Sequence, residues 1–73
     1  MNRRLGRFLS RLNKPELEGY RELLNLTEDE EKVFNCLAKG KNKTQTAMIC
    51  SFSTTTIDNR IRDINEKLNR LIN

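Results

Sequence analysis

The sequence predicts an all-α fold, a small bundle of short helices. Its 73 residues include one proline, three glycines and four aromatic side chains, a composition poor in the residues that favour strands. Apolar side chains recur at spacings of three and four, which is the period of amphipathic helices. A chain of this length forms one domain with a small core, so a large catalytic cleft is not expected.

Two short helices are predicted in residues 1–25, an N-terminal helical segment used for packing or dimerisation. The first covers residues 3–12 and has an apolar face made of Leu5, Phe8, Leu9 and Leu12. Pro15 follows it, and proline lacks the amide hydrogen that a helix interior needs. Since proline is tolerated in a first helical turn, a second helix begins there and ends near Asn25. The apolar side of this helix consists of Leu17, Tyr20 and Leu24.

The clearest helix start in the chain is at Thr27. Its hydroxyl can accept from the amide of Glu30, while the Glu30 carboxylate can accept from the amide of Thr27, which makes a capping box. The acidic first turn also suits the helix dipole. A helix of about a dozen residues is predicted, with Gly40 as its left-handed stop. Its buried face consists of Val33, Phe34, Leu37 and Ala38.

A short helix, a tight connection and a longer helix complete the chain. The short helix falls within residues 41–50, and three of its side chains are expected to pack: Ala47, Met48 and Cys50. In the connection, Phe52 fills the core and Ser53 caps the last helix, residues 54–71. This arrangement is the outline of a helix-turn-helix unit.

The last helix carries two opposite stripes. Its apolar seam consists of Ile57, Ile61, Ile64, Leu68 and Leu71. The polar stripe consists of Thr55, Asn59, Arg62 and Glu66, with Asp58 beside it. Hydroxyl, amide and guanidinium groups on one helix face are suited to reading base edges in the DNA major groove. An ordinary solvated amphipathic helix has the same pattern.

Charge is arranged in blocks, although the net charge is only +4. Residues 1–14 carry five basic side chains and no acid, residues 15–31 carry seven acids, and residues 32–45 carry four lysines and no acid. Two basic blocks separated by an acidic one indicate that phosphates are attracted to particular faces. The alternative interpretation is that these charged blocks are solvated faces that bind no partner.

Several classes of site are not supported. The chain has no histidine, and Cys36 and Cys50 are 14 positions apart, so no metal site is predicted. No nucleophile–base pair or phosphate loop indicates an enzyme, and no cofactor is expected. Both cysteines lie at apolar helix positions, which favours buried free thiols over a disulfide. The apolar stretches are too short for a membrane span, so no membrane partner and a cytoplasmic location are expected.

Thirteen residues between positions 26 and 68 follow one family pattern without a gap. They are Leu26, Thr27, Glu30, Val33, Ala38, Gly40, Ala47, Ser53, Thr56, Ile57, Ile64, Lys67 and Leu68. The pattern runs L-T-x-x-E-x-E-V-L, A-x-G, I-A-x-x-L-x-I-S-x-x-T-V and I-x-x-K-L. Phe34, Cys50 and Phe52 replace aliphatic residues in it. Residues 26–68 therefore resemble the LuxR/GerE-type helix-turn-helix DNA-binding domain.

The resemblance implies that residues 26–73 form the DNA-binding domain and that residues 54–71 enter the major groove. Base contacts are implied for Thr55, Asp58, Asn59 and Arg62. Asn pairs with adenine and Arg with guanine, each contributing about 1–3 kcal/mol of discrimination, and Asp58 would accept from cytosine or orient Arg62. Phosphate contacts are implied for Lys43, Thr44, Thr54, Thr56 and Arg60.

The sequence also departs from the family. Lys32 and Arg60 stand where Glu and His are usual, and Thr46 replaces a buried Ile, so its hydroxyl needs a partner such as a carbonyl one turn earlier. The family's fourth helix, which often mediates dimerisation, has no counterpart in this sequence. We expect the N-terminal segment or a second subunit to cover the surface it would cover. The candidate dimer or packing surface consists of Leu5, Phe8, Leu9, Leu12, Leu68, Leu71 and Ile72.

Two functions are compatible with these features. The favoured one is a small bacterial or phage-borne transcription regulator, nucleoid-associated, that binds double-stranded DNA sequence-specifically. It would act as a homodimer on two half-sites about one helical turn apart. The alternative is a protein–protein interaction module that uses the same helical scaffold to bind RNA polymerase or another regulator without specific DNA contact. A loss of affinity when Asn59 and Arg62 are replaced by alanine would favour DNA binding. Unchanged affinity in that variant, with a loss when Leu9 or Leu12 is changed, would favour the interaction module.

Overall fold

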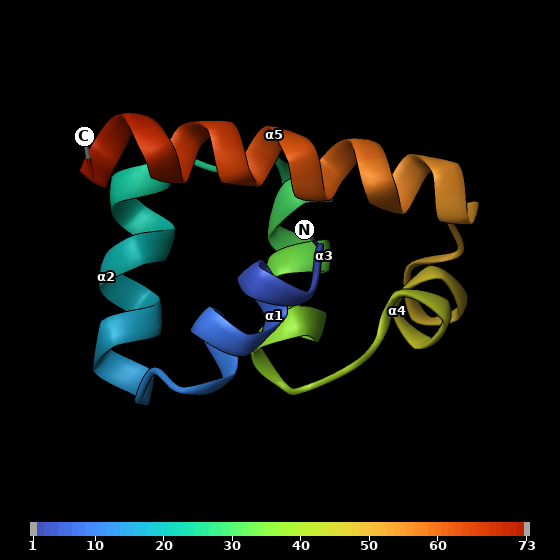
Figure 1. Cartoon of the computed structure of the whole chain (residues 1–73), viewed down its shortest axis with the longest axis horizontal. Coiled ribbons are helices and arrows are strands. Elements are labelled where there is room, and N and C mark those ends of the chain that lie inside the picture. The colour runs from blue at the N-terminus through green and yellow to red at the C-terminus, as the bar shows by residue number, and fades with distance from the viewer. Residues whose placement is uncertain (1, 73) are drawn as a thin grey trace.

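Residues 2–72 form five α-helices around one core, as a computed structural model shows (Figure 1). The structure describes the backbone of residues 2–72 and the side chains of residues 5–71. The helices are α1 (Asn2–Ser10), α2 (Lys14–Leu24), α3 (Glu28–Ala38), α4 (Lys43–Cys50) and α5 (Thr54–Ile72). The described backbone contains no strand, so the predicted all-α class is confirmed.

Helix α5 runs along one edge of the molecule, and the other four helices lie on one side of it (Figure 1). Helix α4 contacts the N-terminal half of α5, and α2 contacts its C-terminal half. Helix α3 is central, since it contacts α5, α1 and α4. The other described helices therefore leave the opposite long side of α5 uncovered.

All five helices contribute to the core. The buried cluster consists of Leu5, Leu9, Leu24, Val33, Phe34, Leu37, Ala47, Ile57, Ile61, Ile64 and Leu68. Leu9 of α1 is only 1% exposed, and α1 packs against both α3 and α5. Phe8 and Leu12 pack at the margin of this cluster, and the Phe8 ring meets that of Tyr20 edge-on, with centroids 5.5 Å apart. The N-terminal helices thus share one core with α3, α4 and α5.

Three helices begin with a capping box. The predicted box before α3 is confirmed, because the Thr27 amide donates to Glu30 Oε1 at 2.9 Å and the Glu30 amide donates to Thr27 Oγ1 at 3.3 Å. The same reciprocal bonds join Asn13 to Glu16 before α2, and Asn42 to Gln45 before α4. Local sequence alone therefore favours the starts of α2, α3 and α4.

Two helix ends also follow local rules. Gly40 has a φ of 84° after α3, as predicted from its freedom to adopt left-handed backbone. Helix α1 ends at Ser10 rather than at the predicted residue 12. The amides of Arg11 and Leu12 donate to the carbonyls three residues earlier, so the chain tightens and leaves the helix there.

In the short helix α4, the prediction for Thr46 is confirmed and the prediction for Met48 is wrong. Thr46 is fully buried, and its hydroxyl donates to the Asn42 carbonyl at 2.8 Å, the predicted bond one turn earlier. Met48 does not pack, as it is 76% exposed. Helix α4 turns Thr46 and Ala47 into the core, and a rotation of about 200° from Thr46 directs Met48 away from it.

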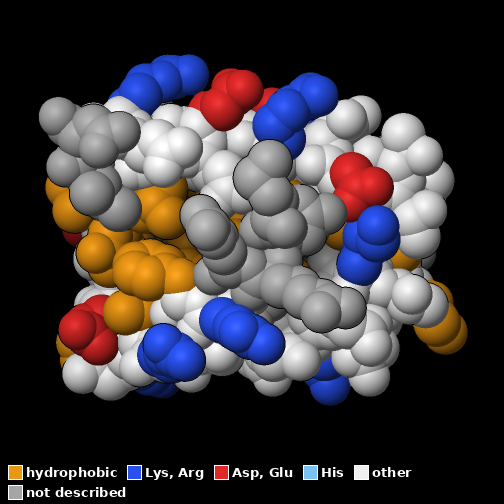
Figure 2. Space-filling model, in the orientation of Figure 1, with side chains coloured by type: hydrophobic (Ala, Val, Ile, Leu, Met, Phe, Trp, Pro, Cys, Tyr) orange, Lys and Arg blue, Asp and Glu red, His pale blue; other side chains and the backbone are white. Residues whose placement is uncertain are grey.

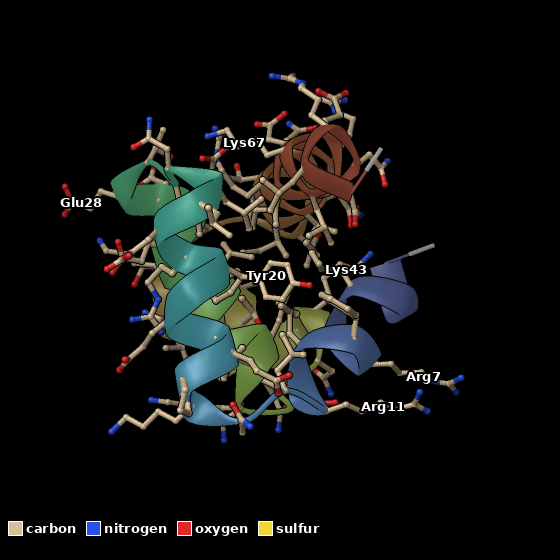
Figure 3. The ribbon with its side chains drawn as sticks, turned by 90° about the vertical axis from the view of Figure 1, so that its left-hand side faces the viewer. Arg7, Arg11, Tyr20, Glu28, Lys43 and Lys67 are labelled. Atoms are coloured by element: carbon tan, nitrogen blue, oxygen red, sulfur yellow. The ribbon has the colours of Figure 1, made fainter. Side chains whose placement is uncertain are left out.

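An ion pair ties α5 to the junction of α2 and α3. Lys67 points from α5 toward this junction (Figure 3), and its Nζ lies 2.5 Å from Glu30 Oε1 and 3.4 Å from the Asn25 carbonyl. Burial alone would raise the pKa of Glu30. The hydrogen bonds from Lys67 and Thr27, together with the Lys67 charge, outweigh this and hold the pKa of Glu30 below its ordinary 4.5.

We expect acid to remove the stability that this pair contributes. Because the pKa of Glu30 is lower in the folded than in the unfolded chain, its contribution is present above about pH 4.5 and is lost as the pH falls through the folded value. Thermal melts of the protein and of Glu30→Gln from neutral pH to about pH 3 measure this. Their difference in Tm should shrink toward acid pH, and a difference that stays constant would show that the Glu30 charge does not matter.

Candidate nucleic-acid interface

Helix α4, a tight turn and α5 form the predicted helix-turn-helix unit. Ser51 follows α4 in left-handed conformation, with φ 59°, and the Phe52 amide donates to the Ala47 carbonyl at 3.0 Å. Phe52 packs against the core, and Ser53 Oγ accepts from the Thr56 amide at 3.1 Å. Both roles agree with the prediction. These bonds fix the direction in which α5 leaves the turn.

The buried seam of α5 decides which side chains face outward. Ile57, Ile61 and Ile64 are fully buried, so the stripe opposite them is directed away from the bundle. Thr55 is exposed, Asn59 is half-buried, and the Arg62 side chain is 65% exposed. The Arg62 Nε lies 3.9 Å from Asp63 Oδ1, a contact too long to hold the guanidinium in place. The structure thus brings Thr55, Asn59 and Arg62 to one accessible face.

An ion pair joins the start of α4 to α5. Lys43 Nζ lies 3.3 Å from Asp58 Oδ1, and both side chains are exposed. The sequence prediction considered Asp58 as a partner of Arg62 and missed Lys43, which is 15 positions away. An exposed pair contributes only about 0–1 kcal/mol to stability. Its larger effect is to set a carboxylate and an ammonium beside the outward face of α5.

Removing this carboxylate is expected to strengthen the DNA binding that the sequence predicts. Asp58→Asn frees Lys43 and removes repulsion from phosphates, so we expect a roughly two- to fivefold higher affinity at low salt and a steeper salt dependence. Fluorescence anisotropy across a salt series measures it, with Glu18→Gln on α2 as a control of equal charge change. A lower affinity for one sequence would instead indicate that Asp58 accepts from a base.

The candidate phosphate contacts differ in accessibility. Lys43 and Thr44 are exposed in the first turn of α4, and Thr54 is exposed at the start of α5. Thr56 is half-buried, and its Oγ1 is hydrogen-bonded to Ser53 Oγ at 3.0 Å. Arg60 is the most engaged, since its Nη1 lies 3.0 Å from Asp63 Oδ2. Lys43, Thr44 and Thr54 therefore form the accessible part of this set.

On the face that Figure 2 shows, the basic side chains do not gather in one patch. Figure 2 shows Lys and Arg side chains on several sides of one face of the molecule. Arg7 and Arg11 point outward from α1, on a different element from Lys43 (Figure 3). The distribution of charge on this face therefore does not identify the interface. The candidate interface is identified by the outward side chains of α5.

Other kinds of site find no support in the side chains at positions 5–71. No three metal-binding side chains among them are placed to hold an ion. Within the same part of the chain, no helix combines the length and the apolar character needed to cross a membrane.

Comparison with known proteins places this geometry in a family. The family model described as bacterial regulatory proteins, luxR family, matches residues 24–70. Neither a curated protein nor a solved structure matched the chain. The matched segment runs from the last residue of α2 through α3 and α4 to near the end of α5, and it contains the whole helix-turn-helix unit. Because the match covers more than half of the sequence, the chain belongs to the luxR family of bacterial regulatory proteins, which are DNA-binding transcription regulators.

Proposed function

We propose that the protein binds double-stranded DNA sequence-specifically, with α5 in the major groove. The observation that carries this proposal is the uncovered side of α5, which presents Thr55, Asn59 and Arg62 above a buried isoleucine seam. An α-helix fits the major groove, where the Asn59 amide can pair with adenine and the Arg62 guanidinium with guanine. Thr55 can donate to or accept from an adjacent base.

The start of α4 supports this orientation. Lys43, in the first turn of α4, reaches α5, because its ammonium pairs with Asp58. In a helix-turn-helix protein, such groups contact the phosphate backbone while the second helix reads bases. Thr54 and Thr56 extend these contacts along α5, and Arg60 joins them only if it leaves Asp63. The protein then acts as a small transcription regulator at the bacterial nucleoid, in the cytoplasm.

We further propose that two copies bind one operator. Exposed apolar side chains cluster where α2 and α5 end, as Leu23 is 65% exposed and Leu71 is accessible beside it. Leu68, next along the seam, is already in the core, and the side chain of Ile72 lies outside the described residues. A second copy placed by a twofold axis would bury this cluster against its own equivalent. The same axis would set two half-sites about one helical turn apart.

A protein–protein interaction module is the second candidate. The observation that favours it is the apolar pair on α4, where Met48 is 76% and Ile49 is 59% exposed. Large exposed apolar side chains next to each other are typical of surfaces that bind other proteins. RNA polymerase or another regulator would be the partner in that case.

Selection from a randomised duplex library separates these functions. The protein is incubated with the library at about 0.15 M salt, where non-specific phosphate binding is weakened, and bound fragments are sequenced. An inverted repeat supports a dimeric regulator, whereas a lone half-site supports a monomer. The double variant Asn59→Ala/Arg62→Ala, checked for folding, serves as control. Absence of enrichment with the folded protein would refute sequence-specific binding and favour the interaction module.

A further inference from the structure

The two cysteines of the chain lie in contact between α3 and α4. Cys36 and Cys50 are free thiols, and their Sγ atoms are 4.0 Å apart. Cys36 is buried on α3, while Cys50 is half-buried at the last position of α4. Two apolar side chains of other types would fill the same space, so packing does not require two thiols there.

We propose that Cys36 and Cys50 are a redox-sensitive pair that forms a reversible disulfide between α3 and α4 when the protein meets a low-molecular-weight disulfide. The bond would join α3 to α4, the first helix of the helix-turn-helix unit. This modification is independent of the proposed DNA binding, and it is tested without DNA.

The geometry favours bond formation at this place. A disulfide requires an S–S distance near 2.05 Å, so the two sulfur atoms must approach by about 2 Å from their present contact. Cys50 is the last residue of α4, and the backbone leaves the helix at Ser51. A side chain at a helix end adjusts with less disruption than one in a helix interior. Bond formation therefore requires rotation of the two side chains and a small shift at Cys50.

The chemistry proceeds in two exchange steps. The Cys50 thiolate, which is the more accessible, attacks one sulfur of the small disulfide, forms a mixed disulfide and releases one small thiolate. The Cys36 thiolate then attacks Cys50 Sγ, closes the protein disulfide and releases the second small thiolate. The protein loses two electrons and two protons, and the small disulfide is reduced to two thiols. Excess thiol reverses both steps.

The surroundings of Cys50 make the pair slow to react near neutral pH. Burial raises the pKa of the Cys50 thiol, and the neighbouring Cys36 and Asp29 raise it further, while Lys32 lowers it. Since only the thiolate attacks, the reaction accelerates as the pH rises. The two thiols therefore stay reduced during brief exposure to the small disulfide and are oxidised when an excess of it persists.

The test uses the full chain and oxidised glutathione at about pH 8.5, where more of the Cys50 thiol is ionised than at neutral pH. We expect a monomer that has lost two hydrogen atoms, has no alkylatable thiol and recovers both thiols in dithiothreitol. Its Tm should rise by about 5–15 °C, because the bond restrains the unfolded chain. Cys36→Ala should instead hold one glutathione on Cys50 and show no such rise, and Cys50→Ala should keep its buried thiol.

Three results would overturn the proposal. One is a protein that keeps both thiols under conditions in which Cys36→Ala becomes glutathionylated. Another is an end product with disulfides between two chains or with two glutathiones. The third is an oxidised monomer whose Tm is unchanged or lower, because the bond would then strain the native packing instead of fitting the contact between Cys36 and Cys50.

Discussion

Replacing Leu9 with alanine is expected to lower the free energy of unfolding by about 3 kcal/mol. Leu9 is 1% exposed and belongs to the cluster that joins α1 to α3 and α5. Its truncation removes buried apolar surface and leaves a cavity that the three helices close only in part. A domain of this size has about 4–11 kcal/mol in total, so the loss is a large share. Urea denaturation followed by circular dichroism measures it.

Leu23→Ala is the matched control, since the same atoms are removed from a side chain that is 65% exposed on α2. We expect it to change the free energy of unfolding by less than about 0.5 kcal/mol. If Leu9→Ala were equally mild, α1 would not be packed into the core in solution. The N-terminal helices would then be free to act as a separate interaction segment.

Local patterns in the sequence predicted most of the fold. The start of α3 followed from two side chains three positions apart, and the seam of α5 followed from its helical period. Thr46 shows how far such reasoning reaches. A polar side chain at a buried helix position requires a partner, and its own helix supplies the Asn42 carbonyl. Each of these predictions depended on residues at most one or two turns apart.

What the sequence did not reveal depends on contacts between distant residues. The pairing of Lys43 with Asp58 and the contact of Cys36 with Cys50 arise only when α4 packs against α3 and α5. Met48 was wrongly expected to pack because apolar character alone was considered. The rotation of α4 is set by Thr46 and Ala47, which a hydrophobic pattern underestimates. The outward face of α5 could be predicted, whereas the groups that border it could not.

Arg62→Ala is expected to weaken binding to the selected DNA site by about 5- to 150-fold, which corresponds to the 1–3 kcal/mol of a good bidentate contact with guanine. Stability should hardly change, since the Arg62 side chain is 65% exposed and its contact with Asp63 is long, at 3.9 Å. Anisotropy titrations with the selected duplex measure the loss. A second duplex, changed at single positions, shows which base pair Arg62 reads.

The change in sequence specificity, rather than the change in affinity, distinguishes the two possible roles of Arg62. If the Arg62 guanidinium reads a base, Arg62→Ala should no longer distinguish the selected duplex from the duplex changed at that one base pair. The discrimination between these two duplexes would have come from Arg62. If it only neutralises phosphate, both duplexes should lose affinity by the same factor, and the salt slope should fall by about one. Arg11→Ala, on the outward side of α1, removes the same charge away from α5 (Figure 3). An equal and sequence-independent loss in both variants would mean that the polar face of α5 does not enter the groove.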